Sequence, residues 1–178
     1  MRLLAFLVVA ICFLSCEGNF KDVQRMGQTE FAPSGEAHDF ELKYTDSGRI
    51  TSILKSPLMR DFNQLAHPYT EFPKGVSVTM YEKTGKRTFI TAKYGINYKG
   101  TTVIELKDSV RITNEAGQRF ASEQLFFDQK NDWFYTDQAF RYTDSRGTST
   151  GTGVDFNKDF TIINSQKISG EFSEGAAN

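Results

Sequence analysis

Few residues in this chain have side chains suited to chemistry. The only cysteines are Cys12, inside the apolar N-terminal run Leu3–Leu14, and Cys16 just after it. The remainder of the chain therefore has no thiol for a disulfide, a metal or a nucleophile. The two histidines, His38 and His67, lie 29 residues apart with no metal-ligand spacing around them. The sequence thus predicts neither a metal site nor a cofactor.

Carboxylates are plentiful, but their spacing selects no catalytic pair. Asp132, Asp137 and Asp144 fall in predicted turns, where Asp favours local hydrogen bonds. Two facing carboxylates could build a glycosidase site on a β-sandwich. An enzyme acting on carbohydrate therefore stays an alternative, and it would need a polar cleft lined by carboxylates.

The charge balance argues against a nucleic-acid partner. Lysine and arginine number 21 against 22 for aspartate and glutamate. No run of lysine and arginine forms a basic stripe, so no nucleic-acid surface is predicted.

Cys16 is the residue with the clearest predicted chemistry. The apolar run before it is shorter than the ~20 residues that span a bilayer, and it fits the core of a secretory signal. Ser15-Cys16 at its end resembles a bacterial lipoprotein cleavage site, so residues 1–15 are predicted to be a signal peptide and Cys16 a lipid anchor. The alternative is an ordinary signal peptide with an incidental cysteine. Residues 16–37, polar and glycine-containing, are predicted to be a flexible tether, and residues 38–178 the folded domain.

The elements after the tether alternate between apolar and polar residues, which is typical of strands. Phe40, Leu42 and Tyr44 share one strand face, and an Asp-Ser-Gly turn follows. Three prolines break up the following stretch, so Leu58–Phe62 is predicted to be only a brief edge element. Strands are also predicted at residues 50–54 and 76–80.

Three tandem units fill the second half of the chain. They open at Gly85, Gly117 and Gly147, at intervals of 32 and 30 residues. Each unit holds an alternating segment, a short apolar segment and a final short strand, and in the first unit Ile90, Ala92, Tyr94 and Ile96 are expected to share one face. Repeated units of this kind cannot bury their apolar faces alone. The chain is predicted to be all-β and antiparallel, and tandem units suit an open, stackable sheet better than a closed barrel.

The ordered set of short motifs resembles the LptC family, membrane-anchored periplasmic components of lipopolysaccharide export. It covers roughly residues 40–172 and includes Val110-Arg111-Ile112, the segment Leu125 to Asp128, and the glycine-bearing strand Gly151 to Phe156. The family resemblance implies a twisted, open antiparallel β-jelly roll built from the tandem strand repeats. It implies a lipid adaptor without enzymatic activity that takes lipopolysaccharide from an inner-membrane ABC transporter and passes it to a periplasmic bridge protein. Well-known members carry an uncleaved transmembrane helix where this chain has its predicted lipoprotein signal. We therefore expect a periplasmic protein that is anchored to the inner membrane by the lipidated Cys16.

The resemblance also implies site residues. A lipid groove is expected from the inward-facing residues Ile90, Ala92, Tyr94, Ile104, Leu106, Val110, Ile112, Leu125, Phe127, Phe134, Phe140, Tyr142, Val154 and Phe156. An edge for strand addition to the partner is expected at Gly151, Gly153, Ile162 and Ile168. The alternative for the inward residues is that they only fill a core, and for the two glycines that they meet a structural need. A surface lipoprotein for adhesion or assembly would have such a filled core and no ligand.

Overall fold

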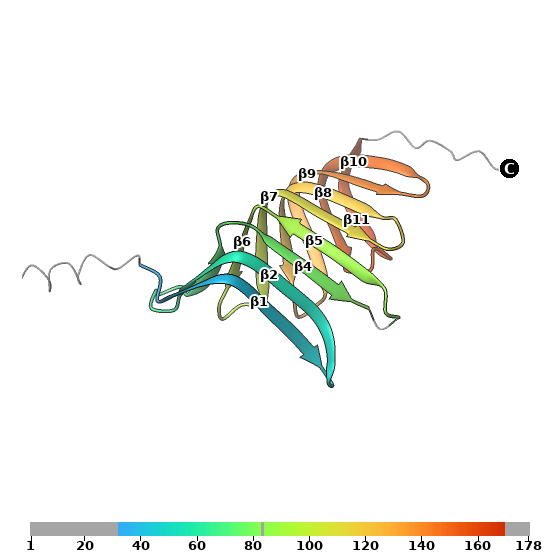
Figure 1. Cartoon of the computed structure of the whole chain (residues 1–178). Helices are drawn as coiled ribbons and strands as arrows, with labels where there is room; N and C mark the ends of the chain where they lie inside the picture. The colour runs from blue at the N-terminus through green and yellow to red at the C-terminus, as the bar shows by residue number, and fades with distance from the viewer. Residues whose placement is uncertain (1–31, 83, 170–178) are drawn as a thin grey trace, which may run out of the picture. The chain divides into compact units, whose positions relative to one another are not determined.

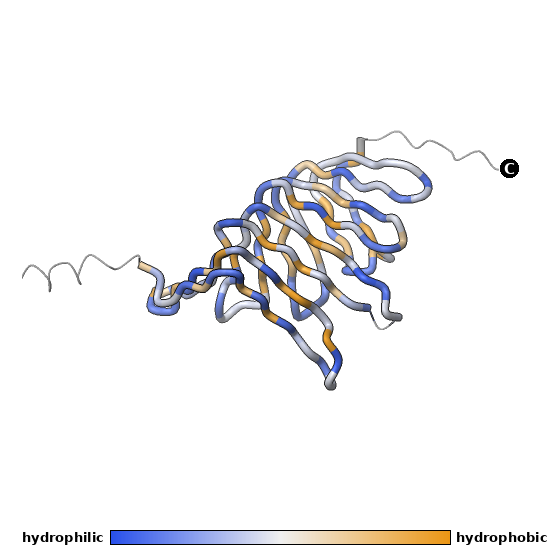
Figure 2. Tube along the Cα trace, in the orientation of Figure 1, coloured by the Kyte–Doolittle hydropathy of each residue, from blue (hydrophilic) through white to orange (hydrophobic). Residues whose placement is uncertain are grey.

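The computed structural model describes residues 32–82 and 84–169, and all of its regular structure in these ranges is β-strand. No helix in this part of the chain could cross a bilayer. Alternating apolar and polar residues run along the strands, as Figure 2 shows. The strands are β1 (Gly35–Asp46), β2 (Arg49–Phe62), β3 (Tyr69–Phe72), β4 (Val76–Tyr81), β5 (Arg87–Ala92), β6 (Tyr94–Tyr98), β7 (Val103–Asn114), β8 (Arg119–Asp128), β9 (Trp133–Asp144), β10 (Gly147–Asn157) and β11 (Ile163–Ser169).

All the strands belong to one antiparallel sheet (Figure 1). Its order is β11-β10-β9-β8-β7-β5-β4-β2-β3-β6, with β6 also pairing with β7, and β1 pairing with β2. In the described residues β1 and β11 each pair with one neighbour, so they form the two edges of the sheet. The predicted all-β, antiparallel fold of β-jelly-roll type is confirmed.

The sheet is folded lengthwise into two facing layers, because its longest strands change pairing partner halfway. The first half of β2 pairs with β4 and its second half with β3. In the same way β7 pairs with β6 and then with β5. We call the half that contains β4 and β5 the first layer, and the half that contains β3 and β6 the second layer. The line along which the strands pass between them is the spine.

Irregular backbone marks the spine. In β7 the pairing shifts between Lys107 and Val110, where Asp108 and Ser109 adopt positive φ angles of 60° and 56°. The Lys93 N–H, between β5 and β6, donates to the Asp108 carbonyl at 2.9 Å. Bulges of this kind bend a strand and strengthen its twist, which is what folds the sheet.

The three tandem units predicted from the sequence correspond to bent hairpins. The turns near Gly85, Gly117 and Gly147 lie at the free rim of the first layer. At these turns the strands β5, β8 and β10 begin. In the first unit, β5 and β6 together occupy the place that the single long strand β8 takes in the second unit and β10 takes in the third. The break between β5 and β6 lies at Lys93. Each unit therefore crosses both layers and returns.

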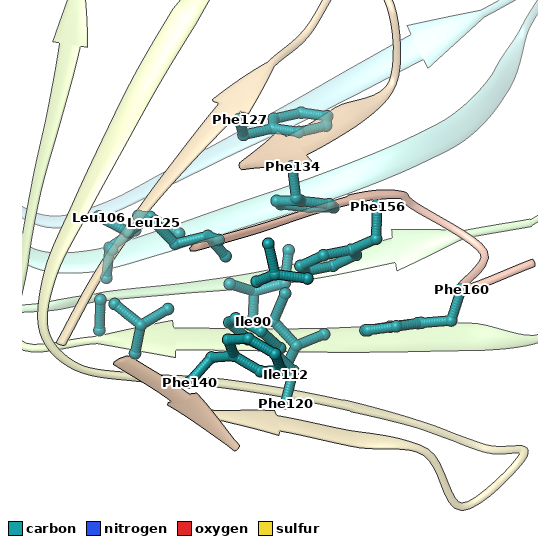
Figure 3. Close-up of a cluster of buried hydrophobic side chains, with 14 of the residues drawn as sticks. Ile90, Leu106, Ile112, Phe120, Leu125, Phe127, Phe134, Phe140, Phe156 and Phe160 are labelled. Atoms are coloured by element: carbon teal, nitrogen blue, oxygen red, sulfur yellow. The ribbon is translucent and has the colours of Figure 1, made fainter. Parts of the chain in front are cut away.

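The apolar core lies between the two layers, as the close-up in Figure 3 shows. Phe120 in the first layer contacts Phe156 in the second, with ring centroids 4.8 Å apart. Phe134 stacks on Phe127 at 4.5 Å and on Phe156 at 5.3 Å. The aromatic rings thus fill the space between the layers under β8, β9 and β10.

Two expectations from the sequence need correction. Leu58–Phe62 is no edge element, since it forms the second half of β2 and pairs with both β1 and β3. Pro57 is tolerated there because it takes part in no strand pairing, opposite Asp39 with its positive φ. Ile90, Ala92, Tyr94 and Ile96 do not share one face, because the interruption at Lys93 reverses the alternation.

The predicted signal peptide and most of the predicted tether lie outside the described residues. The first strand starts at Gly35, within the segment predicted as tether. Ser34 is already tied to the sheet, since its N–H and hydroxyl both contact the Asp61 carbonyl, at 2.7 and 2.8 Å.

Candidate functional site

An apolar cavity of about 190 Å³ lies between the two layers at the β1 end of the sheet. Both layers contribute to its wall. The lining residues are Phe40, Leu42, Tyr44, Leu54, Met59, Asp61, Thr70, Phe72, Asn97, Lys99 and Ile104.

The edge strand β1 supplies one wall of the cavity through its period-two alternation. Phe40, Leu42 and Tyr44 point inward, while the residues between them point to solvent. Leu42 pairs directly with Leu54 on β2. Because β1 has no neighbour on its outer side, Leu42 and Tyr44 each stay 37% exposed. The cavity is therefore open to solvent along this edge.

The second layer supplies the opposite wall. Phe72 of β3 lies across from Phe40, with ring centroids 6.1 Å apart. Met59 and Ile104 are partly buried and pack against the core from β2 and β7. A hydrocarbon chain lying in the cavity would touch apolar side chains from both layers.

One end of the cavity is polar. Asp61 forms a close ion pair with Lys99 and accepts a hydrogen bond from the Thr70 hydroxyl at 2.9 Å. Asn97, paired with Thr70, also lines this end. The site thus joins an apolar wall to a polar rim, the arrangement that an amphiphile with a hydrocarbon tail and a hydrated head requires.

Most of the residues predicted to line a lipid groove lie in the filled core and are at most 8% exposed. Among the fourteen, Ile104 is shared with the cavity lining. Tyr94 faces outward, where its hydroxyl donates to Glu71 at 2.7 Å, because of the interruption at Lys93. The remaining twelve belong to the buried cluster: Ile90, Ala92, Leu106, Val110, Ile112, Leu125, Phe127, Phe134, Phe140, Tyr142, Val154 and Phe156.

The residues predicted for the partner edge divide between two strands. Gly151 and Gly153 lie in β10, which is paired on both sides and is not the edge. Ile168 lies on the edge strand β11 and is 56% exposed, and Ile162 just before it is 50% exposed. The backbone that is available for strand addition on this side therefore belongs to β11.

The structure explains why β10 has glycine at positions 151 and 153. A Cβ at Gly151 would lie 2.1 Å from the Lys167 carbonyl oxygen and 2.8 Å from the Phe140 ring. Gly153 forms the bulge of β10 with a φ of +72°, which side-chain-bearing residues rarely adopt. Both glycines thus let β11 approach closely.

Apart from Ile104, sequence reasoning missed the residues that line the cavity. The alternation of Phe40, Leu42 and Tyr44 was visible, but it does not tell whether the strand lies inside the sheet or at its edge. Met59 and Phe72 lie among the prolines that obscured this part of the chain. The missing information was the position of β1 in the sheet, since an edge strand leaves its inward side chains partly uncovered.

A second electrostatic feature lies on the outer face of the second layer. Glu105 is buried there and accepts hydrogen bonds from the Tyr98 hydroxyl at 2.5 Å and from Gln124, with Lys107 at 3.0 Å. Burial opposes its ionisation, but these donors together hold the pKa of Glu105 below its usual value. Burial, followed by the hydrogen bond to Glu105, raises the pKa of Tyr98 to about 12. The charged carboxylate ties β6, β7 and β8 together.

The described residues contain no cluster of three or more histidine, cysteine or acidic side chains that could hold a metal ion. Asp61 is the one carboxylate in the cavity wall, and Lys99 pairs with it. A glycosidase needs two carboxylates facing each other across its cleft. The cavity therefore offers binding chemistry, dominated by apolar contact.

Comparison with known proteins identifies a family for this chain. Residues 3–164 match the sequence profile of the family described as "Lipopolysaccharide-assembly, LptC-related". No curated protein matches the chain. The family is a component of lipopolysaccharide transport, periplasmic and associated with the inner membrane, and is not a family of enzymes. Because the match covers most of the sequence, this chain belongs to the LptC-related family of lipopolysaccharide-assembly proteins.

Proposed function

We propose that this protein is a non-enzymatic adaptor that accepts lipopolysaccharide from an inner-membrane ABC transporter and passes it to a periplasmic bridge protein. The observation that carries the proposal is the apolar cavity at the β1 edge, with its partly exposed Leu42 and Tyr44. Exposing an acyl chain to water costs about 0.8 kcal/mol per CH₂. A chain of a dozen carbons thus resists crossing an aqueous compartment by roughly 10 kcal/mol, and a covered path removes that barrier.

The size of the cavity limits what it holds at one time. An engineered cavity of about 150 Å³ accommodates one benzene molecule. A cavity of about 190 Å³ therefore takes a segment of one acyl chain. A lipid with several chains requires the two layers to part further, and the place where they part at least cost is the β1 edge, where the core is not filled by stacked rings.

The two edge strands are the proposed contacts with other components. Strand addition to an exposed edge gives affinity through main-chain hydrogen bonds. A neighbouring jelly roll added to β1 would continue the cavity wall, and one added to β11 would continue the sheet at its other end. We assign the transporter to β1 and the bridge protein to β11. The exposed Ile162 and Ile168 support an apolar contact at the β11 end.

Membrane attachment is proposed to come from an acylated Cys16 and the chain that links it to the folded domain, which begins at Ser34 and β1. Labelling of the mature protein with radioactive palmitate, with and without Cys16→Ala, tests the anchor. Label retained in the variant would defeat the assignment.

Photo-crosslinking from two neighbouring residues of β1 tests lipid binding. Leu42 points into the cavity, and Lys43 points to the opposite face. A photoreactive phenylalanine analogue at position 42 should give an adduct with lipopolysaccharide in cells, and the same analogue at position 43 should not. Adducts from both positions equally, or from neither, would contradict a lipid path through the cavity.

Depletion of the protein provides an independent measurement. Lipopolysaccharide should accumulate at the inner membrane and viability should fall. An adhesion or assembly lipoprotein would leave lipopolysaccharide transport unchanged.

A further inference from the structure

Three arginines that are far apart in the sequence come together on the outer face of the first layer. Arg111 of β7 and Arg141 of β9 both pair with Ala121 of β8, one on each side. Arg119 lies two residues before Ala121 on the same face. Neighbouring strands are ~4.8 Å apart, so the Cα atoms of Arg111 and Arg141 are roughly 10 Å apart. We call these three residues the arginine cluster.

The three arginines of the cluster form no ion pair with other described residues. Some exposed basic side chains elsewhere have acidic partners, such as Lys55 with Glu41 and Arg87 with Glu115. Glu123, the next outward residue along β8 after Ala121, accepts a hydrogen bond from the Ser109 N–H at 3.1 Å.

The surroundings of the arginine cluster are polar and bear hydroxyl groups. By register, Arg111 pairs with Thr91, and Arg119 pairs with Thr113 and Thr143. All three arginines and Thr91 and Thr113 are exposed. Guanidinium groups bind phosphate oxygens in a bidentate manner, and hydroxyls add further donors.

We propose that the arginine cluster docks this face of the protein onto an anionic phospholipid surface. A protein partner would require a central group of buried aromatic or apolar anchors, whereas by register the arginines are flanked by alanine and threonine, with Glu123 next along β8. Phe89, 37% exposed at the margin of this face, suits the headgroup region of a bilayer. An array of separate phosphates matches three guanidinium groups spread over neighbouring strands.

The length of chain before the domain permits this contact. Residues 17–32 could extend over roughly 50–58 Å, so a domain tethered at Cys16 could turn any face to the bilayer, and charge would select the face. This reach rests on the proposed anchor, but the arginine cluster does not. The contact is also independent of lipid passage through the cavity.

The magnitude follows from membrane electrostatics. A basic residue near an anionic surface contributes about 1 kcal/mol, or roughly fivefold in partition. Three such residues should shift the ratio of docked to undocked protein by on the order of 100-fold. The attraction should weaken in high salt, because charges at the membrane surface are screened within ~10 Å at 0.1 M ionic strength.

The test uses the full chain, purified from membranes and reconstituted into vesicles. A fluorophore is attached at Thr91→Cys, beside the arginine cluster, or at Asn164→Cys, on the outer face of the second layer. The parent chain, labelled in parallel, gives the background from any unprocessed protein that still carries Cys12 and a free Cys16 thiol. Lipids with a quencher on the headgroup report proximity, in phosphatidylethanolamine vesicles containing either phosphatidylglycerol or phosphatidylcholine.

We expect strong quenching at position 91 and weak quenching at position 164, in phosphatidylglycerol vesicles and at low salt. The triple variant R111Q/R119Q/R141Q should lose it, whereas K86Q/K130Q/K167Q, with the same change in net charge, should keep it. Equal quenching at the two positions, or quenching unaffected by the anionic lipid, would overturn the proposal. Absence of quenching in these protein-free bilayers would also overturn it and would favour an acidic protein as the occupant. The triple arginine variant should still form lipopolysaccharide adducts from position 42. Membrane docking and lipid binding in the cavity are therefore tested separately.

Discussion

Replacing Gly151 with alanine should detach the β11 edge of the sheet. The new Cβ would lie 2.1 Å from the Lys167 carbonyl oxygen, whereas real Cβ atoms almost never come closer than 3.0 Å to such an atom. The backbone of β11 would have to retreat by about 1 Å, because a carbonyl cannot turn aside as a flexible side chain can. The Phe140 ring, at 2.8 Å, blocks movement of the Cβ to the other side.

The cost can be worked out from the pairing that is lost. Residues 150–152 of β10 pair with residues 167–169 of β11. Losing two to four backbone hydrogen bonds at ~1 kcal/mol each gives a destabilisation of about 2–4 kcal/mol. For a domain of this size, that corresponds to a fall in Tm of roughly 5–12 °C.

Thermal unfolding and amide hydrogen exchange measure the effect, with Gly35→Ala as the matched control. Gly35 also lies in a strand at an edge of the sheet, but the nearest atom to its Cβ would be Asp61 Cβ at 3.9 Å. That control should be neutral, or stabilising by up to ~1 kcal/mol, because alanine restricts the unfolded chain. Exchange at the β11 amides should accelerate only in Gly151→Ala. If both variants melt within 1–2 °C (roughly) of the parent and β11 exchange is unchanged, the close approach of Lys167 to Gly151 is refuted.

Three further predictions concern the interior and the outer face. Phe134→Ala should destabilise the domain by about 3–5 kcal/mol in urea unfolding, because Phe134 is fully buried between Phe127 and Phe156; a loss below ~1 kcal/mol would mean that this part of the interior is not a packed core. Leu42→Ala should lower the free energy of unfolding by only ~1 kcal/mol or less, since Leu42 is 37% exposed. It should nevertheless lower lipopolysaccharide crosslinking from a photoreactive analogue in place of Tyr44, and unchanged crosslinking would contradict the lipid path. Glu105→Gln should be destabilising at neutral pH by roughly 1–3 kcal/mol. The pKa of Glu105 is lower in the folded than in the unfolded state, so its charge stabilises the fold above pH 4.5 and this stabilisation is lost as the pH falls below that value. In urea unfolding, the difference in unfolding free energy between parent and variant should therefore narrow in acid. A constant difference would rule out the charged form as the cause.

The alternation of apolar residues predicted the inward faces of the later strands well. Val110 and Ile112, Leu125 and Phe127, and Val154 and Phe156 all lie in the core. Period-two patterning is reliable there because both faces of the local sheet are defined, one packed and one wet.

The same reasoning fails where the backbone departs from a regular strand. The interruption at Lys93 places Tyr94 on the opposite face from the one that simple alternation predicts, and no residue type at that position signals it. Long-range pairing is also invisible in a single sequence. The sequence therefore indicated an inward apolar face, but not that its C-terminal part is filled by stacked rings while its N-terminal part remains open.

The arginine cluster illustrates the same limit for charge. Arg111, Arg119 and Arg141 form no basic run, so the sequence predicted no charged surface. Strand register brings them together across β7, β8 and β9. A charged patch built across a sheet can be recognised only when the pairing is known.

The bent hairpin as the repeating unit has a consequence for how such a protein can change in length. Inserting a whole hairpin of about 30 residues between β9 and β10 would lengthen the sheet by two strands and leave both terminal strands, with their contacts, unaltered. A single-residue insertion inside β8 would instead turn every following side chain of that strand to the wrong face. Duplication of entire units is thus the simplest evolutionary route to a longer sheet, and small insertions should be confined to the rim turns.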